Sequence, residues 1–243
     1  MSLASGIEWL QLWERAVPWA PHRRRRELLA WAGAQGGPPP AQLPVGRANA
    51  LLLRLHVAMF GPRIDCSATC PACAEALELE IDAGDLLGWE PPPLAGPALF
   101  QDAEWGMSFR LPTELDVEVT RNERDPRVAR NLLLQRCVSE CRRGAEPVDI
   151  LLAPPEVTTR LGARMEELDP LAVIDFELRC RGCGHGRSSS LEVDSILWAR
   201  LDAWARRMLD EVHELARVYG WTERDIVAMS PWKRLVYLDL VAR

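Results

Sequence analysis

The most specific chemistry in this sequence comes from its cysteines. Four of the seven form two C-x-x-C pairs, Cys70 with Cys73 and Cys180 with Cys183. A C-x-x-C turn lets both thiolates face one ion while backbone N–H groups brace the sulfurs, and two such turns give a closed tetrahedral site. The spacing therefore predicts one structural metal site with four cysteine ligands, occupied by one Zn²⁺ per chain.

The sequence after each pair supports this interpretation. Leu79–Asp82 follows the first pair and Leu191–Asp194 the second, and both read Leu-Glu-hydrophobic-Asp. Alternation of apolar and charged residues is typical of a strand with one wet face. In a zinc ribbon, two hairpin-like arms share one ion. Here about 106 residues separate the two arms in the sequence.

Other interpretations of the cysteines stay open. They could be reduced dithiols or scattered thiols without a metal, and Cys66 or His185 lies close enough to replace one ligand. A redox-active pair is disfavoured because neither pair opens a helix in a thioredoxin-like context. Four cysteines leave no open coordination position, so a bound zinc is expected to be structural and not catalytic.

These residues must be positioned by helices and strands, and the sequence predicts an α+β fold for them. The fold is expected to be mostly helical, with zinc-ribbon-like β knuckles from two distant arms. Helices are predicted at about 5–33 with a break near Pro18, and at 47–60, 126–142, 155–168 and 194–219. Strands are predicted at 77–82 and 105–111 and at Leu191 and Val193, and 91–99 is interpreted as a linker. The predicted segments are an N-terminal helical segment (1–63), a first zinc knuckle and strand (64–84), an inserted mixed or helical region (85–170), a second zinc knuckle with strands (171–194) and a C-terminal helical segment (195–243).

The charge of the chain and its use of cysteine limit which ligands it could bind and in which compartment it is expected. The net charge is −6, and the stretch between Asp65 and Glu118 holds twelve acids and one base, which argues against broad binding of nucleic acid. The one basic run, His22–Arg26, could contact nucleic acid, lipid head groups or an acidic partner, or simply form a solvated face. Seven cysteines and a start, Met1–Ala4, without signal-peptide features predict a soluble, cytoplasmic protein without disulfides or membrane insertion.

No motif for catalysis is recognisable. The sequence has no H-E-x-x-H, no G-x-S-x-G and no phosphate-binding glycine loop. We therefore expect no catalytic residues and no small-molecule substrate, although an active site assembled from distant residues would leave no such motif.

Aromatic side chains gather near the C-terminus instead. The chain has ten tryptophans, and exposed indoles often anchor protein interfaces. The predicted partner-binding residues are Trp198, Trp221, Trp232, Arg234 and Tyr237.

Several stretches together resemble a known family. They are Leu43–Ala48, Phe60–Arg63, the C-P-x-C pair, Cys180–His185, Leu197–Trp198, Val212–Ala216, Tyr219–Glu223, Ile226, Met229–Arg234 and Tyr237–Leu238. The chain resembles the baseplate proteins related to the hub-assembly chaperones of T-even-type phages, which also occur in gene clusters of phage-tail-like contractile injection systems.

This resemblance implies a non-enzymatic role in building or forming the baseplate of a contractile particle. Its partners would be baseplate, hub, spike or tail-tube proteins. The chain would be cytoplasmic or incorporated in the assembled particle. The alternative from the residues is a zinc-ribbon adaptor in a nucleic-acid-associated complex that uses His22–Arg26.

Overall fold

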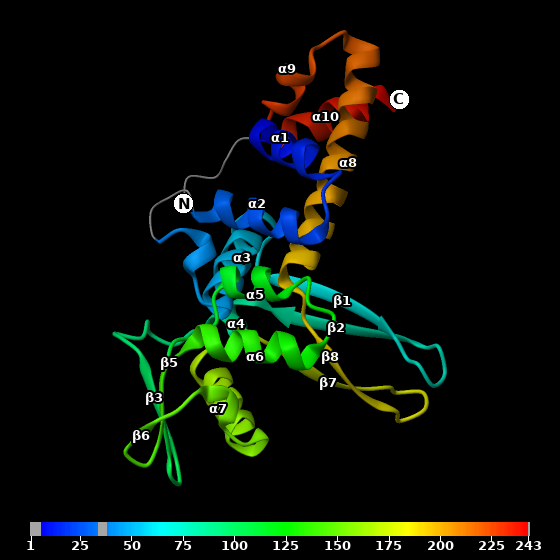
Figure 1. Cartoon of the computed structure of the whole chain (residues 1–243). Helices are drawn as coiled ribbons and strands as arrows, with labels where there is room; N and C mark the ends of the chain where they lie inside the picture. The colour runs from blue at the N-terminus through cyan, green and yellow to red at the C-terminus, as the bar shows by residue number, and fades with distance from the viewer. Residues whose placement is uncertain (1–5, 34–37, 243) are drawn as a thin grey trace.

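A 27-residue helix, α8 (Val193–Tyr219), forms the axis of the molecule (Figure 1). The computed structural model describes residues 6–33 and 38–242. The buried side of α8 includes Leu197, Leu201 and Leu215, which are spaced as one apolar stripe along a helix. The helix ends at Gly220, whose φ of 69° lies in the left-handed region that glycine adopts without steric cost.

Helices cover both ends of this axis. The helical elements outside the inserted region are α1 (Gly6–Ala16), α2 (Pro21–Gly33), the 3₁₀ turn η1 (Pro40–Gln42), α3 (Val45–Phe60), α4 (Ala83–Leu87), α9 (Glu223–Val227) and α10 (Pro231–Val241). α1, α9 and α10 contact α8 toward its C-terminal end, and α2 and α3 contact it nearer its start. The first described helix, α1, and the last, α10, therefore both lie against the C-terminal half of α8 (Figure 1).

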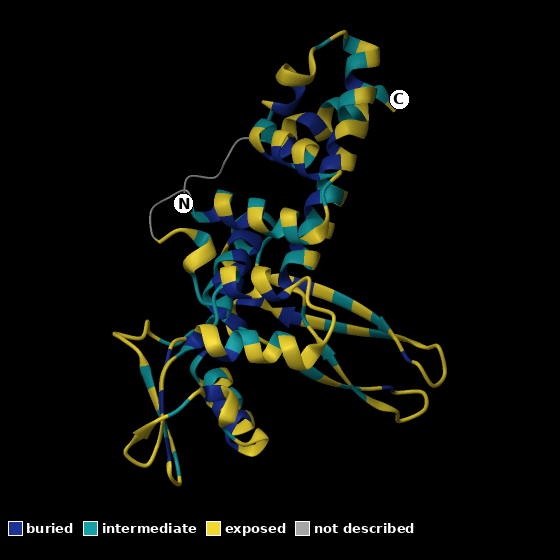
Figure 2. Ribbon diagram, in the orientation of Figure 1, coloured by how far each residue is buried: buried dark blue, intermediate teal, exposed yellow. Residues whose placement is uncertain are grey.

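Two β-hairpins project from the body as separate arms (Figure 1). The first pairs β1 (Arg63–Thr69) with β2 (Ala76–Asp82), and the second pairs β7 (Asp175–Arg179) with β8 (Gly186–Ser190); both are antiparallel. The arms are anchored at their bases, because Ile64 and Ile174 lie buried in the main core with α2, α3 and the start of α8. Toward their tips the arms become more exposed (Figure 2).

The inserted region, which lies between the two arms in the sequence, has its own sheet and its own apolar cluster. Its elements are β3 (Ala98–Asp102), β4 (Trp105–Phe109), α5 (Glu114–Thr120), α6 (Pro126–Cys137), β5 (Val138–Arg143), β6 (Glu146–Pro147), the 3₁₀ turn η2 (Ile150–Leu152) and α7 (Pro155–Leu168). The four strands pair in the order β3-β4-β5-β6. Trp105, Met107 and Phe109 alternate along β4 and pack with Leu161 of α7 in one buried cluster.

The structure confirms the α+β class and the predominance of helix, but it corrects three elements. The helix predicted over 126–142 ends at Cys137, because Val138 is extended and starts β5, which pairs with β4. β8 ends at Ser190 and Val193 begins α8, so the strand predicted at Leu191 and Val193 is wrong. Part of the predicted linker 91–99 forms the start of β3.

Two sequence predictions concern the membrane and the N-terminus. No helix in the described part of the chain is long and apolar enough to span a bilayer. Met1–Ala4, which lack signal-peptide features, lie outside the described residues.

The basic run His22–Arg26 is occupied by contacts within the chain. The guanidinium of Arg25 forms two hydrogen bonds to Glu114 and further bonds to Asn49 and Asp194. Asn49 in turn donates to the backbone oxygen of Leu171 at 2.7 Å. This buried network joins α2 to α3, to α5 of the inserted region and to the start of α8.

The neighbouring arginines are also engaged. Arg24 bonds to the backbone oxygens of Ala16 and Val17 at the end of α1, and its guanidinium lies 4.5 Å from the ring centre of Trp198. Arg26 pairs with Glu118 on the surface. The run therefore fastens helices together and is not simply a solvated face.

We predict that Arg25→Ala lowers the free energy of unfolding by about 3–5 kcal/mol, because it leaves Glu114 and Asp194 partly buried without their cation. The matched control is Arg26→Ala, which removes an exposed pair and should cost about 0–1 kcal/mol. Urea denaturation monitored by tryptophan fluorescence measures both. Equal losses for the two variants would contradict this account.

Candidate metal centre

The four cysteines of the two C-x-x-C pairs meet at the tips of the arms. Their Sγ atoms all lie within 4.8 Å of one another. Across the arms, Cys70 Sγ lies 3.7 Å from Cys183 Sγ, and Cys73 Sγ lies 3.5 Å from Cys180 Sγ. A tetrahedron with metal–sulfur bonds of about 2.3 Å has sulfur–sulfur edges of about 3.8 Å. The donor set and its spacing therefore fit one metal ion.

The same turn presents the thiols in each arm. The N–H of Cys70 donates to the oxygen of Glu75 at 2.8 Å, and the N–H of Cys180 donates to the oxygen of His185 at 2.9 Å. The residue after the second cysteine then adopts positive φ, 61° at Ala74 and 74° at Gly184. Each turn leaves its first cysteine buried and its second exposed.

Backbone and side-chain neighbours set the protonation of the thiols. Burial raises the pKa of Cys70, but the backbone N–H groups of Ala72 and Cys73 outweigh it and lower that pKa to about 7. At Cys180 the Cys183 N–H lowers the pKa, yet burial and the bond to Glu75, whose carboxylate is 3.3 Å from the sulfur, bring it to about 12. A metal that binds four thiolates at neutral pH therefore displaces protons from this cluster.

The remaining cysteines and the nearby histidine lie outside the cluster. Cys66 is half-buried on β1, and His185 is exposed at the tip of the second arm. Cys137 and Cys141 are buried in the inserted region, where burial raises the pKa of each thiol. These two cysteines are core side chains that lie outside the four-thiol cluster.

The predicted partner-binding residues occupy different environments. Trp198 is half-buried beneath Arg24, and Trp221 stacks on Tyr219 at 4.4 Å while meeting Tyr237 edge-on at 4.8 Å. The rings of Tyr219, Trp221 and Tyr237 fasten the corner between α8 and α10.

Two neighbouring residues of α10 differ sharply in exposure. Arg234 is buried and bonds to Glu211 and to the oxygen of Met229, so its placement on a contact surface needs correction. Trp232 is 76% exposed.

Trp232 has exposed apolar neighbours that its sequence context did not single out. Leu235, Val236 and Leu240 are also exposed and lie on the same side of α10, at steps of three, four and eight residues from Trp232. The sequence does show apolar residues on both sides of α10. It does not show which of the two sides faces α8.

Comparisons with protein-family models, with curated proteins and with solved structures find no match to this chain.

We predict that removing the metal loosens the arms and leaves the body folded. The reason is that the three apolar cores lie away from the tips. After chelation, hydrogen–deuterium exchange should rise over 63–82 and 175–190 and stay slow in α3 and α8. The same pattern is expected for Cys180→Ser. Cooperative loss of protection throughout the chain would contradict this localisation.

The left-handed residue of each turn gives a second prediction. Gly184→Ala should destabilise the metal-loaded arm by about 1 kcal/mol, because a side chain is disfavoured at positive φ. Nothing lies within 4 Å of an added Cβ there, so the cost is conformational and not steric. Ala74→Gly, the matched change in the first arm, should be neutral or stabilising. Chelator-competition titrations would measure both, and a loss for Ala74→Gly as large as that for Gly184→Ala would refute the argument.

Proposed function

We propose that this chain is a non-enzymatic structural or assembly component of the baseplate of a contractile phage tail-like particle, stabilised by one structural zinc. The contact role rests on one observation above the others, the outward apolar side of α10 formed by Trp232, Leu235, Val236 and Leu240. Apolar groups exposed together on a helix commonly mark a protein interface. The resemblance in sequence supplies the baseplate setting.

The cysteine cluster supports the structural part of this proposal. Four thiolates are soft ligands that select zinc or iron, and with zinc they form a closed site without a position for substrate. The residues that would hold the ion are Cys70, Cys73, Cys180 and Cys183. When bound, the ion supplies a covalent link between two arms that are distant in sequence. Elemental analysis should find about one zinc per chain, and a visible absorption band from an iron–thiolate centre would reject zinc.

The contacts of the basic run weigh against the zinc-ribbon adaptor of a nucleic-acid complex. That alternative requires free arginines in 22–26, yet Arg24, Arg25 and Arg26 are bound to carbonyl or carboxylate groups of the chain. The acidic stretch from Asp65 to Glu118 adds repulsion toward phosphates.

The proposal predicts that the tagged chain, recovered from its native host, carries baseplate-wedge, spike or tail-tube proteins. Trp232→Ala should reduce this recovery about tenfold or more, as expected for an interface hot spot. Trp89→Ala is the matched control, because Trp89 is also exposed (48%) but lies beyond the end of α4, away from α10. Quantitative mass spectrometry of the captured proteins measures the effect.

Two results would overturn the proposal. One is recovery of nucleic acid or polymerase subunits in place of particle proteins. The other is an equal effect of the Trp89 and Trp232 substitutions, which would mean that α10 does not present the contact.

A further inference from the structure

One of the four histidines of the chain, His56 near the end of α3, lies in the interior and is 1% exposed. Its Nδ1 atom lies 3.1 Å from the backbone oxygen of Gly61. A neutral imidazole has one N–H donor and one bare acceptor nitrogen, and a carbonyl oxygen can only accept. Nδ1 therefore carries the proton in the folded chain, and Nε2 is the bare nitrogen.

The surroundings of Nε2 offer it no partner. The atom is buried, and no group in the described part of the chain forms a hydrogen bond with it. The ring of Phe60 lies edge-on to the imidazole, with the ring centres 5.6 Å apart. A second proton would place an N–H donor and a positive charge at Nε2, where burial makes both costly. The fold therefore favours the neutral ring.

The charge nearest in effect also opposes protonation. Burial lowers the pKa of His56, the positive charge of Arg200 on α8 lowers it further, and the bond to Gly61 raises it only in part. Among the described residues, Arg200 is the one charged group that shifts this pKa, and no carboxylate compensates for it. A protonated His56 would thus face a like charge across the contact between α3 and α8.

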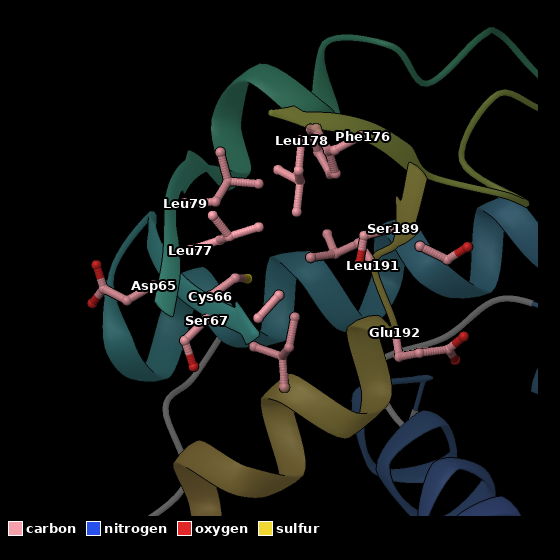
Figure 3. Close-up of a pocket in the computed structure, with 13 residues that line it drawn as sticks. Asp65, Cys66, Ser67, Leu77, Leu79, Phe176, Leu178, Ser189, Leu191 and Glu192 are labelled. Atoms are coloured by element: carbon pink, nitrogen blue, oxygen red, sulfur yellow. The ribbon is translucent and has the colours of Figure 1, made fainter. Parts of the chain in front are cut away.

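Arg200 is itself bound to the first arm. Its guanidinium lies 3.1 Å from the carboxylate of Asp65 on β1, and Asp65 also binds Arg63. The side chain of Asp65 points away from the apolar hollow between the two arms (Figure 3). Cys66 is the other titratable group beside Arg200 on this strand, and burial raises the pKa of its thiol. The neighbours of the imidazole therefore connect α8 to the start of β1.

His56 also holds the turn that leads from the body into the first arm. α3 ends at Phe60, and Gly61 turns the chain with a φ of 85° before β1 begins at Arg63. The backbone oxygen of Pro62 accepts a hydrogen bond from the N–H of Ala83 at 2.8 Å, which joins the two ends of the hairpin. The imidazole thus lies where α3, α8 and the base of the arm meet.

We propose that His56 is a pH-sensitive contact that holds the base of the first arm to the body. At neutral pH the uncharged ring packs in the junction of α3, α8 and β1. In mildly acidic solution Nε2 takes up a proton from the solvent, and the junction opens so that water reaches the new N–H and Arg200 moves away. The inference requires neither a metal at the cysteines nor the baseplate setting, so each can fail without the others.

The sign of the effect on stability follows from the lowered pKa of His56 in the folded chain. The stabilisation is complete above the unfolded value of about 6.5 and is lost as the pH falls below it. From pH 7.5 to pH 5.5, the unfolding equilibrium constant of the unchanged chain should rise up to about tenfold more than that of His56→Gln. The matched control, His213→Gln at an exposed position, should respond as the unchanged chain does. Urea denaturation at each pH, followed by tryptophan fluorescence, measures all three, and because the three share the same four cysteines, any effect of a metal cancels.

Two measurements on the unchanged chain keep the test open if His56→Gln does not fold. Nitrogen-15 NMR of the histidine rings should show His56 with its proton on Nδ1 at pH 7.5 and a titration midpoint below those of the other three. Substitution of His22, His185 and His213 by glutamine, one at a time, assigns the signals. Hydrogen–deuterium exchange at pH 5.5, corrected for the intrinsic rate, should rise over 56–66 and 196–204 and stay slow in α7.

Any of three outcomes rejects the inference. The first is the same response to pH in the unchanged chain and in His56→Gln. The second is a His56 ring that titrates at the ordinary histidine value or carries its proton on Nε2. The third is exchange at pH 5.5 that shows no local rise at the junction.

Discussion

The convergence of two thiol pairs at the tips of two arms is the constraint on which the rest of this structure depends. Cys73 and Cys180 are 107 residues apart in the chain, yet their sulfurs lie 3.5 Å apart. The whole inserted region must therefore begin and end beside the arms. Ile64 and Ile174 meet this requirement at the bases by entering one core, so the tips need to be joined only locally.

The body is fastened by a second kind of interaction, the buried contacts of a few cations. Arg25 joins α2, α3, α5 and α8 through carboxylates and an amide that would otherwise be costly to bury. Asp116 does the same within the inserted region. It is fully buried, and although burial raises its pKa, hydrogen bonds from Arg110, Thr113 and Arg136 hold that pKa well below its usual range. Such networks fix the orientation of elements that apolar packing alone would leave free to slide.

The surfaces left open lie at opposite places on this frame. One is the outward side of α10, held against α8 by Arg234 and the stacked rings around Trp221. The other is the hollow between the arms, which apolar residues of both arms line. A long helical axis that carries an exposed apolar helix face fits the proposed role of joining other proteins.

The sequence by itself determined the features that depend on local chemistry. The apolar stripe of α8, its glycine stop, the serine and threonine caps of α9 and α10, and the pairing of two C-x-x-C turns all follow from residue type and spacing. Only the tertiary structure decided that residues 138–143 form a strand, because β5 is stabilised by pairing with β4 and not by its own propensity. The same holds for Arg25, Arg234 and Trp221, whose side chains could be solvated or buried until the facing elements are known. The hollow between the arms belongs wholly to the tertiary structure, since its walls come from two segments that are distant in sequence and whose bases are buried in one core.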